Sequence, residues 1–230
     1  MGRIIDAVLR GYMEPMDAAA EAFFGLVMAL EISNVARLAL IGQDEDMIMS
    51  VLLVAIIGCN LAWGMADGVM NALSNYYDKL RQYRLAIELS SATKEQAEVR
   101  AEQALRDSMS QMEKQLLDDH GIRVMAEEIV RCTKASHPEK PRLGKEEINI
   151  WGISLFFNAF MALPILAIYL VAGSIGLNAA TLLANVVGLV LFFAIGYVLD
   201  RNVGPYKFLT GFVMVIVGFV MLGIIIVLGG

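Results

Sequence analysis

The sequence predicts an all-α membrane protein with five transmembrane helices and a cytoplasmic helical domain inserted between the second and third. The first observation is composition: 57% of the 230 residues are hydrophobic, and the mean hydropathy of +0.61 is too high for a soluble domain of this length. The second is that five apolar stretches are each near the ~20 residues a helix needs to cross the hydrocarbon core. The third is a single charged stretch of roughly seventy residues that interrupts them, longer than any ordinary loop.

Residues 1–21 are predicted to form a cytoplasmic lead. They carry charge throughout and have no compact apolar core, so no signal peptide is predicted. Apolar residues recur there at helical spacing: Ile4, Ile5, Val8, Leu9, Tyr12 and Met13. This pattern is typical of an amphipathic helix on the membrane interface that ends near Pro15, although an ordinary juxtamembrane lead fits the same residues.

Two membrane segments follow, 22–75 and 149–230, with the insert at 76–148 between them. The spans themselves are expected at 22–42, 48–74, 150–172, 177–198 and 207–228. The insert holds 13 of the 18 Lys and Arg, and every other basic residue except Arg37 falls on the same side of the membrane. The positive-inside rule makes that side cytoplasmic, so the N-terminus is expected inside and the C-terminus outside.

The first span carries an acid, an amide and a thioether at three-residue spacing, which places Met28, Glu31 and Asn34 on one helical face. An ionisable group in a span costs at least ~2.5–3.5 kcal/mol, so it normally marks a transport path or has a partner. Glu31 is therefore a candidate transport residue. Arg37 could neutralise it, or could extend to the outer surface.

The second span has a polar stripe of Asn60, Gly64, Asp67 and Asn71, with Met70 beside it. Carboxylate, carboxamide and thioether together would suit a borderline ion such as Fe²⁺ or Mn²⁺. The alternative is that the two asparagines only join helices. Predicted transport-site residues are Glu31, Asp67, Met28, Met70, Asn71 and, from the third span, Asn158.

The insert is expected to be helical from residue 76 to about 119, broken only near Ser90 and Ser91, with Gly121 separating it from a further helix. The predicted metal ligands on its acidic face are Glu88, Glu95, Glu98, Glu102, Met109, Met112 and Glu113. Glu127 and Glu128 would join them if the two helices fold back on each other. The alternative is a solvated surface with ion pairs along each helix.

Other function classes have little support. The insert has 13 bases against 14 acids and no basic stripe, so nucleic-acid binding is not expected. An enzyme is not expected either, because no nucleophile–base pair or histidine-based metal motif is present. Cys59 and Cys132 fall in different segments, and no disulfide is predicted between them.

Three stretches carry a resemblance to a known family. They are residues 66–76 (ADGVMNALSNY), residues 157–164 (FNAFMALP), and residues 196–230, which contain a short basic turn followed by TGFVMVIVG. Together with the five spans and the acidic insert, they resemble the vacuolar iron transporter family. That family's first span opens with an Asp-Gly-Leu-Val motif, whereas Phe24 precedes Gly25 here. Glu31, two turns deeper, or Glu21, one turn earlier, would have to substitute for the missing acid.

The resemblance implies a homodimer in the lipid bilayer that exports Fe²⁺ or Mn²⁺ from the cytoplasm in exchange for protons, with the insert collecting the metal. We expect a prokaryotic plasma membrane. Two alternatives stay open. One is a transporter of a different ion, and the other is a non-transporting scaffold whose insert binds a cytoplasmic partner.

Overall fold

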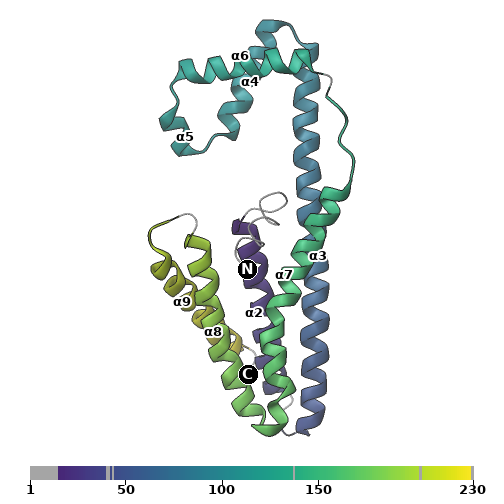
Figure 1. Ribbon diagram of the computed structural model, residues 1–230, viewed down its shortest axis with the longest axis vertical. Helices are drawn as coiled ribbons and strands as arrows, with labels where there is room; N and C mark the ends of the chain where they lie inside the picture. The colour runs from purple at the N-terminus through teal and green to yellow at the C-terminus, as the bar shows by residue number, and fades with distance from the viewer. Residues whose placement is uncertain (1–14, 40–41, 43, 137, 202–203, 229–230) are drawn as a thin grey trace. The chain divides into compact units, whose positions relative to one another are not determined.

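A computed structural model of the chain describes residues 15–39, 42, 44–136, 138–201 and 204–228. The described residues form helices and connecting loops and contain no strand. In chain order, the elements are α2 (Pro15–Ala39), α3 (Glu45–Ser91), α4 (Lys94–Ser108), α5 (Gln111–Leu116), α6 (Asp119–Ala135), α7 (Lys145–Leu170), the short 3₁₀ helix η1 (Ala172–Ser174), α8 (Leu177–Arg201) and α9 (Lys207–Leu228) (Figure 1). The helix expected before Pro15 lies outside the described residues.

Five helical segments are long and apolar enough to cross a membrane: Met16–Leu38, Glu45–Ser91, Lys145–Ser174, Leu177–Asp200 and Lys207–Val227. The all-helical class and the five apolar helices are thus confirmed. The first segment begins six residues earlier than the sequence indicated, because Pro15 is the first residue of α2. Proline suits this position, since its fixed φ fits a helix and its missing N–H needs no partner there.

Helix α3 is longer than a span requires. Its 47 residues correspond to about 70 Å at 1.5 Å per residue, more than twice the ~30 Å hydrocarbon core. No glycine or proline occurs between Gly68 and Ser91 to end the helix near residue 74. The chain divides into two compact units: unit 1 comprises Met1–Ala72 and Lys145–Gly230, and unit 2 comprises Leu73–Gly144.

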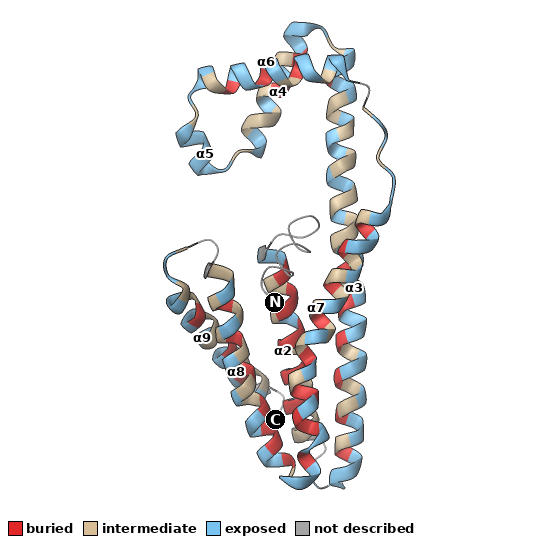
Figure 2. Ribbon diagram, in the orientation of Figure 1, coloured by how far each residue is buried: buried red, intermediate tan, exposed pale blue. Residues whose placement is uncertain are grey.

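Unit 1 has one apolar core around α2. Leu26 and Leu30 of α2 are buried together with residues of the four other long helices, among them Leu52, Ile165 and Phe192 (Figure 2). Close approach fixes the neighbour of α2: a Cβ at Gly25 would lie 2.5 Å from the backbone oxygen of Asn158 in α7. Only glycine permits that distance, so this position lets α2 and α7 touch backbone to backbone.

Unit 2 contains an antiparallel pair, α4 and α6. Ala97 and Ala101 of α4 pack against Ala126 and Val130 of α6, with Leu89 of α3 completing the small core. Thr93 caps α4 by accepting from the Gln96 N–H, and Ser110 and Glu113 form a capping box on α5.

The expected helix to residue 119 is interrupted twice more. Met109 is extended, which ends α4, and Leu117 is extended, which ends α5. Gly121 was expected to separate two helices. It lies instead in the first turn of α6. Its N–H donates to the side chain of Asp118, 2.7 Å away, so the aspartate supplies the helix start.

Candidate functional site

Glu21 is the acid around which unit 1 gathers its polar side chains. It lies on α2 and is only 4% exposed. Its carboxylate accepts a hydrogen bond of 2.6 Å from the Asn71 amide of α3 and another from the Asn158 amide of α7. One carboxylate therefore holds three helices together.

Ser154 completes this arrangement. Its hydroxyl accepts from the same Asn71 amide at 3.1 Å, and it lies one turn before Asn158 on the same face of α7. Ser154 and Asn158 are both fully buried. These side chains are thus enclosed by protein and do not face lipid.

Asp67 brings a second carboxylate to the region. It lies one turn before Asn71 on α3, is half-buried, and interacts electrostatically with Glu21. Its side chain is also hydrogen-bonded to Trp63, one turn earlier. We refer to Glu21, Asp67, Asn71, Ser154 and Asn158 as the Glu21 cluster.

The carbonyl oxygen Oδ1 of Asn158, in this cluster, is buried and has no hydrogen-bond partner among the described residues. The same holds for Oδ1 of Asn60, two turns before Asp67 on α3. Both side chains are at most 1% exposed. A buried acceptor left unpaired costs about 1–3 kcal/mol, so such oxygens require an explanation. They are free to accept from a donor or to ligate a cation.

The structure brings together three of the six predicted transport residues: Asp67, Asn71 and Asn158. Glu31 lies elsewhere. It is exposed on α2 and interacts electrostatically with Cys59. Ten residues separate it from Glu21, which is about 15 Å along a helix.

The two methionines also lie apart from the cluster. Met70 is 66% exposed, because it precedes Asn71 by one residue and therefore points to another face of α3. Met28 is half-buried, and two turns of α2 separate it from Glu21. Neither thioether is among the partners of the Glu21 carboxylate.

Sequence reasoning placed Glu21 at the last position of the cytoplasmic lead. It named Glu21 only as one of two substitutes for the family's missing first-span acid and did not include it among the predicted transport-site residues. Hydropathy set that boundary, because the apolar run begins only at Ala22. The available signal was Pro15 followed by Asp17, an N-terminal proline with an acid in the first turn. A helix that begins there already contains Glu21 in its second turn.

A second polar group joins α2 to α8. Asn34 and Asn185 exchange two amide hydrogen bonds of 2.9 and 3.1 Å, and Arg37 donates to Asn178 at 3.1 Å. This group has no carboxylate among these contacts. It joins α2 to α8 by hydrogen bonds, as asparagines in membrane helices often do.

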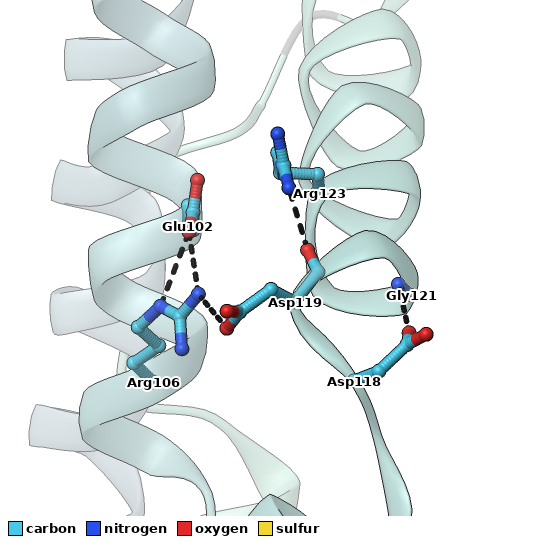
Figure 3. A network of polar contacts seen from close by, with 6 residues as sticks. All are labelled: Glu102, Arg106, Asp118, Asp119, Gly121 and Arg123. Carbon is cyan, nitrogen blue, oxygen red and sulfur yellow. Dashed lines mark hydrogen bonds and ion pairs between the residues drawn. The ribbon is translucent and has the colours of Figure 1, made fainter.

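Several acids of unit 2 form ion pairs with arginine or lysine. Arg106 binds Glu102 at 2.7 Å and Asp119 at 2.8 Å, which links α4 to the start of α6 (Figure 3). The Arg106 guanidinium lowers the pKa of Asp119 below its usual range. Four further pairs are Asp78 with Arg81, Glu88 with Arg100, Glu98 with Lys94, and Glu128 with Arg131.

The remaining predicted ligands of unit 2 are dispersed. Glu113 accepts from the Ser110 N–H, which lowers its pKa, and the side chains of Glu95, Met112 and Glu127 are exposed. Met109 is half-buried at the end of α4. In the part of the chain that the structure describes, no three His, Cys, Asp or Glu side chains lie together.

Comparisons of the chain with protein-family models, with curated proteins and with solved structures found no match.

Proposed function

We propose that this protein is a proton-coupled transporter of a divalent transition metal, Fe²⁺ or Mn²⁺, and that the Glu21 cluster is its transport site. The observation that carries the proposal is Glu21 itself, a carboxylate 4% exposed inside a helix long and apolar enough to span a membrane. Such a group costs at least ~2.5–3.5 kcal/mol to insert. A role in moving charge explains why it is present.

The second acid, Asp67, sets the proposed ratio of two protons exchanged for one divalent cation. Two carboxylates, Glu21 and Asp67, carry two negative charges, which either two protons or one divalent cation would neutralise. The site therefore has low net charge in both loaded states, and a buried site with unbalanced charge is the expensive state. Alternation between the two loads is proton antiport.

The amides of Asn71 and Asn158 fit both states. As donors they stabilise a carboxylate that holds no metal, and their own carbonyl oxygens are ligands that divalent cations accept. Ser154 offers a hydroxyl that can also donate or accept. No group in the cluster needs to leave its helix for the load to change.

The orientation, export from the cytoplasm and the homodimer remain part of the proposal. They rest on the Lys and Arg side chains within 76–148 and on the resemblance to the vacuolar iron transporter family. Glu31 supports the homodimer in one respect: it is exposed in a span, and a second copy covering that face would remove it from lipid.

A membrane scaffold is the second candidate function. It is favoured by unit 2, where six acids are paired with basic side chains and the others do not converge. The short helix α5 also exposes Met112 (71%) and Leu116 (77%), one turn apart. A scaffold would carry no cation across the membrane.

The test is uptake of Mn²⁺ and Fe²⁺ into proteoliposomes under an imposed pH gradient. We expect flux in the wild type, near-complete loss in Glu21→Gln, and loss of pH coupling in Asp67→Asn. Glu31→Gln is the matched control, an identical change on the same helix outside the cluster, and it should retain transport. Equal flux in Glu21→Gln and wild type, in correctly folded protein, would contradict the proposed site.

A further inference from the structure

The contact between α2 and α8 has a polar half, at the end of α2 and the beginning of α8. Asn34 and Asn185 exchange two amide hydrogen bonds there, and one turn further along α2 Arg37 donates to Asn178. Thr181 lies between these two positions on the same face of α8 and is 4% exposed. We refer to Asn34, Arg37, Asn178, Thr181 and Asn185 as the polar seam.

The half of this contact that lies towards Glu21 is apolar. A Cβ at Gly188 would lie 2.5 Å from Cδ1 of Leu30, and the ring centroids of Phe23 and Phe192 are 5.0 Å apart. Beyond these rings α8 diverges from α2 towards the C-terminal end of α8 (Figure 1). The two helices are therefore closed together at the polar seam, and apolar side chains separate that seam from Glu21.

A packing role explains the asparagines of the polar seam but not its arginine. Arg37 is half-buried, and its Nε is buried without a hydrogen-bond partner among the described residues. The bond that it does make goes to a neutral amide oxygen. A cation in a membrane span normally pairs with an acid or faces a water-filled cavity. Water that entered the polar seam would supply the missing partner of Nε.

We propose that the polar seam is the outer part of the transporter's exit path, and that α2 and α8 separate there in a second conformation to admit water. This rests on the proposed transport function and deepens it, because it names the route by which the ion leaves the protein. Asn34, Thr181 and Asn185 line the route. Arg37 is a positive charge at its outer end, where it disfavours the return of a cation.

The physical reason is that a polar contact opens to water more easily than an apolar one. When the polar seam opens, each hydrogen bond between side chains is exchanged for one with water, which changes the free energy little. Opening the contact of Phe23 with Phe192 would instead expose apolar surface, which is unfavourable. Water should therefore reach Asn34 and Asn185 and stop at Leu30. The apolar half then keeps this water apart from the Glu21 cluster, so that the open path does not leak.

The first experiment measures water access with single cysteines in a Cys59→Ser, Cys132→Ser background. Thr181→Cys places a thiol in the polar seam. Ala180→Cys is the matched control, because Ala180 lies at the same depth, is 0% exposed and points to another face of α8. A membrane-impermeant methanethiosulfonate reagent is added to intact cells and, in parallel, to inside-out vesicles.

We expect Thr181→Cys to react at least tenfold faster than Ala180→Cys, and only from the face opposite to the one from which Cys132 reacts in the wild type. Equal rates for the two thiols would overturn the inference. Reaction of Thr181→Cys from the same face as Cys132 would overturn it as well.

The second experiment locks the polar seam. Asn34→Cys and Asn185→Cys are combined in the same background and joined by a short bifunctional thiol reagent whose links a reductant cleaves. Mn²⁺ flux into proteoliposomes should fall at least tenfold on cross-linking and return on reduction. The reagent should leave the flux of the cysteine-free parent unchanged.

The flux measurements separate two failures. Full flux in protein that mass spectrometry shows to be cross-linked would overturn the exit path but leave metal transport intact. Absence of Mn²⁺ flux in the folded wild type and in the cysteine-free parent would contradict the proposed function itself, and the exit path with it.

Discussion

Glu21 illustrates how a single side chain can organise a membrane bundle. Its carboxylate receives amide donors from α3 and from α7, so each amide helps to keep a buried charge hydrogen-bonded. Hydropathy does not register this group because an acid lowers the apolar score of its own segment. By contrast, Asp67 and Asn71 on α3 were among the predicted transport residues, because they repeat at helical spacing within an apolar run.

Glu128 offers a pH test at the same scale. Its pKa is lowered to about 2, first by the hydrogen bond from Arg131 and then by that from Cys132. Since the pKa is lower in the folded state than the ordinary ~4.3, the pair adds stability above that ordinary value. This contribution is lost as the pH falls from about 4.5 towards about 2.

We therefore expect a carboxyl-carbon NMR titration of the full-length protein to show Glu128 ionised at pH 3.5. The variant Arg131→Met should move its pKa up towards the ordinary value. An unchanged titration in that variant would mean that Arg131 does not bind Glu128 in solution.

At the scale of the helix, close contact between α2 and α7 depends on Gly25. A methyl group there meets the Asn158 backbone, so Gly25→Ala must separate the helices and disturb the residues that hold Glu21. We expect a loss of about 1–3 kcal/mol, the usual cost of overpacking.

Gly152→Ala is the matched control for Gly25→Ala. Gly152 is a glycine of α7 with open space around its Cβ position, and alanine there should be neutral or stabilise the helix by up to about 1 kcal/mol. Thermal unfolding in detergent measures both. Equal behaviour of the two variants would show that α2 and α7 are not in contact at residue 25.

Unit 2 depends on a core of few side chains, in which Leu89 is 1% exposed. Leu89→Ala should cost about 2–5 kcal/mol and speed hydrogen exchange in α4 and α6. Leu116→Ala removes the same atoms from a side chain that is 77% exposed and should change exchange little. Similar protection in both variants would contradict the α4–α6 packing.

Element boundaries show why local sequence has limits. The break expected near Ser90 and Ser91 is confirmed, since α3 ends at Ser91 and Thr93 caps the start of α4; a side-chain cap acts within one turn and is therefore visible in local sequence. The extended residues Met109 and Leu117 carry no glycine or proline signal. Their helix ends are set by the Ser110 and Asp118 caps that begin the next helices, a signal that sequence inspection passed over.

At the scale of the whole molecule, five helices are long and apolar enough to cross a membrane, and the orientation that we propose puts unit 2 in the cytoplasm. Cys132 is exposed in unit 2, and Cys59 is half-buried in α3. A membrane-impermeant maleimide should label Cys132 only from the cytoplasmic face of vesicles. Labelling from the outer face in intact vesicles would reverse the proposed orientation.

The fold class was predictable because length and hydropathy act on whole helices, and errors of a few residues leave it unchanged. The site was predictable only in part. Asp67, Asn71 and Asn158 were predicted on the faces of α3 and α7 that meet α2. Which acid of α2 lies beside them depends on the axial register of α2 against these helices. That register is set by contacts such as Gly25 against Asn158, which join residues more than one hundred positions apart.

The central claim is that a metal ion and protons exchange at Glu21. The most direct measurement records both fluxes together in proteoliposomes, with an imposed Mn²⁺ gradient and a pH-sensitive dye. The account predicts that Mn²⁺ movement drives protons in the opposite direction in the wild type, and that both fluxes vanish in Glu21→Gln. Mn²⁺ movement without any proton movement would contradict it.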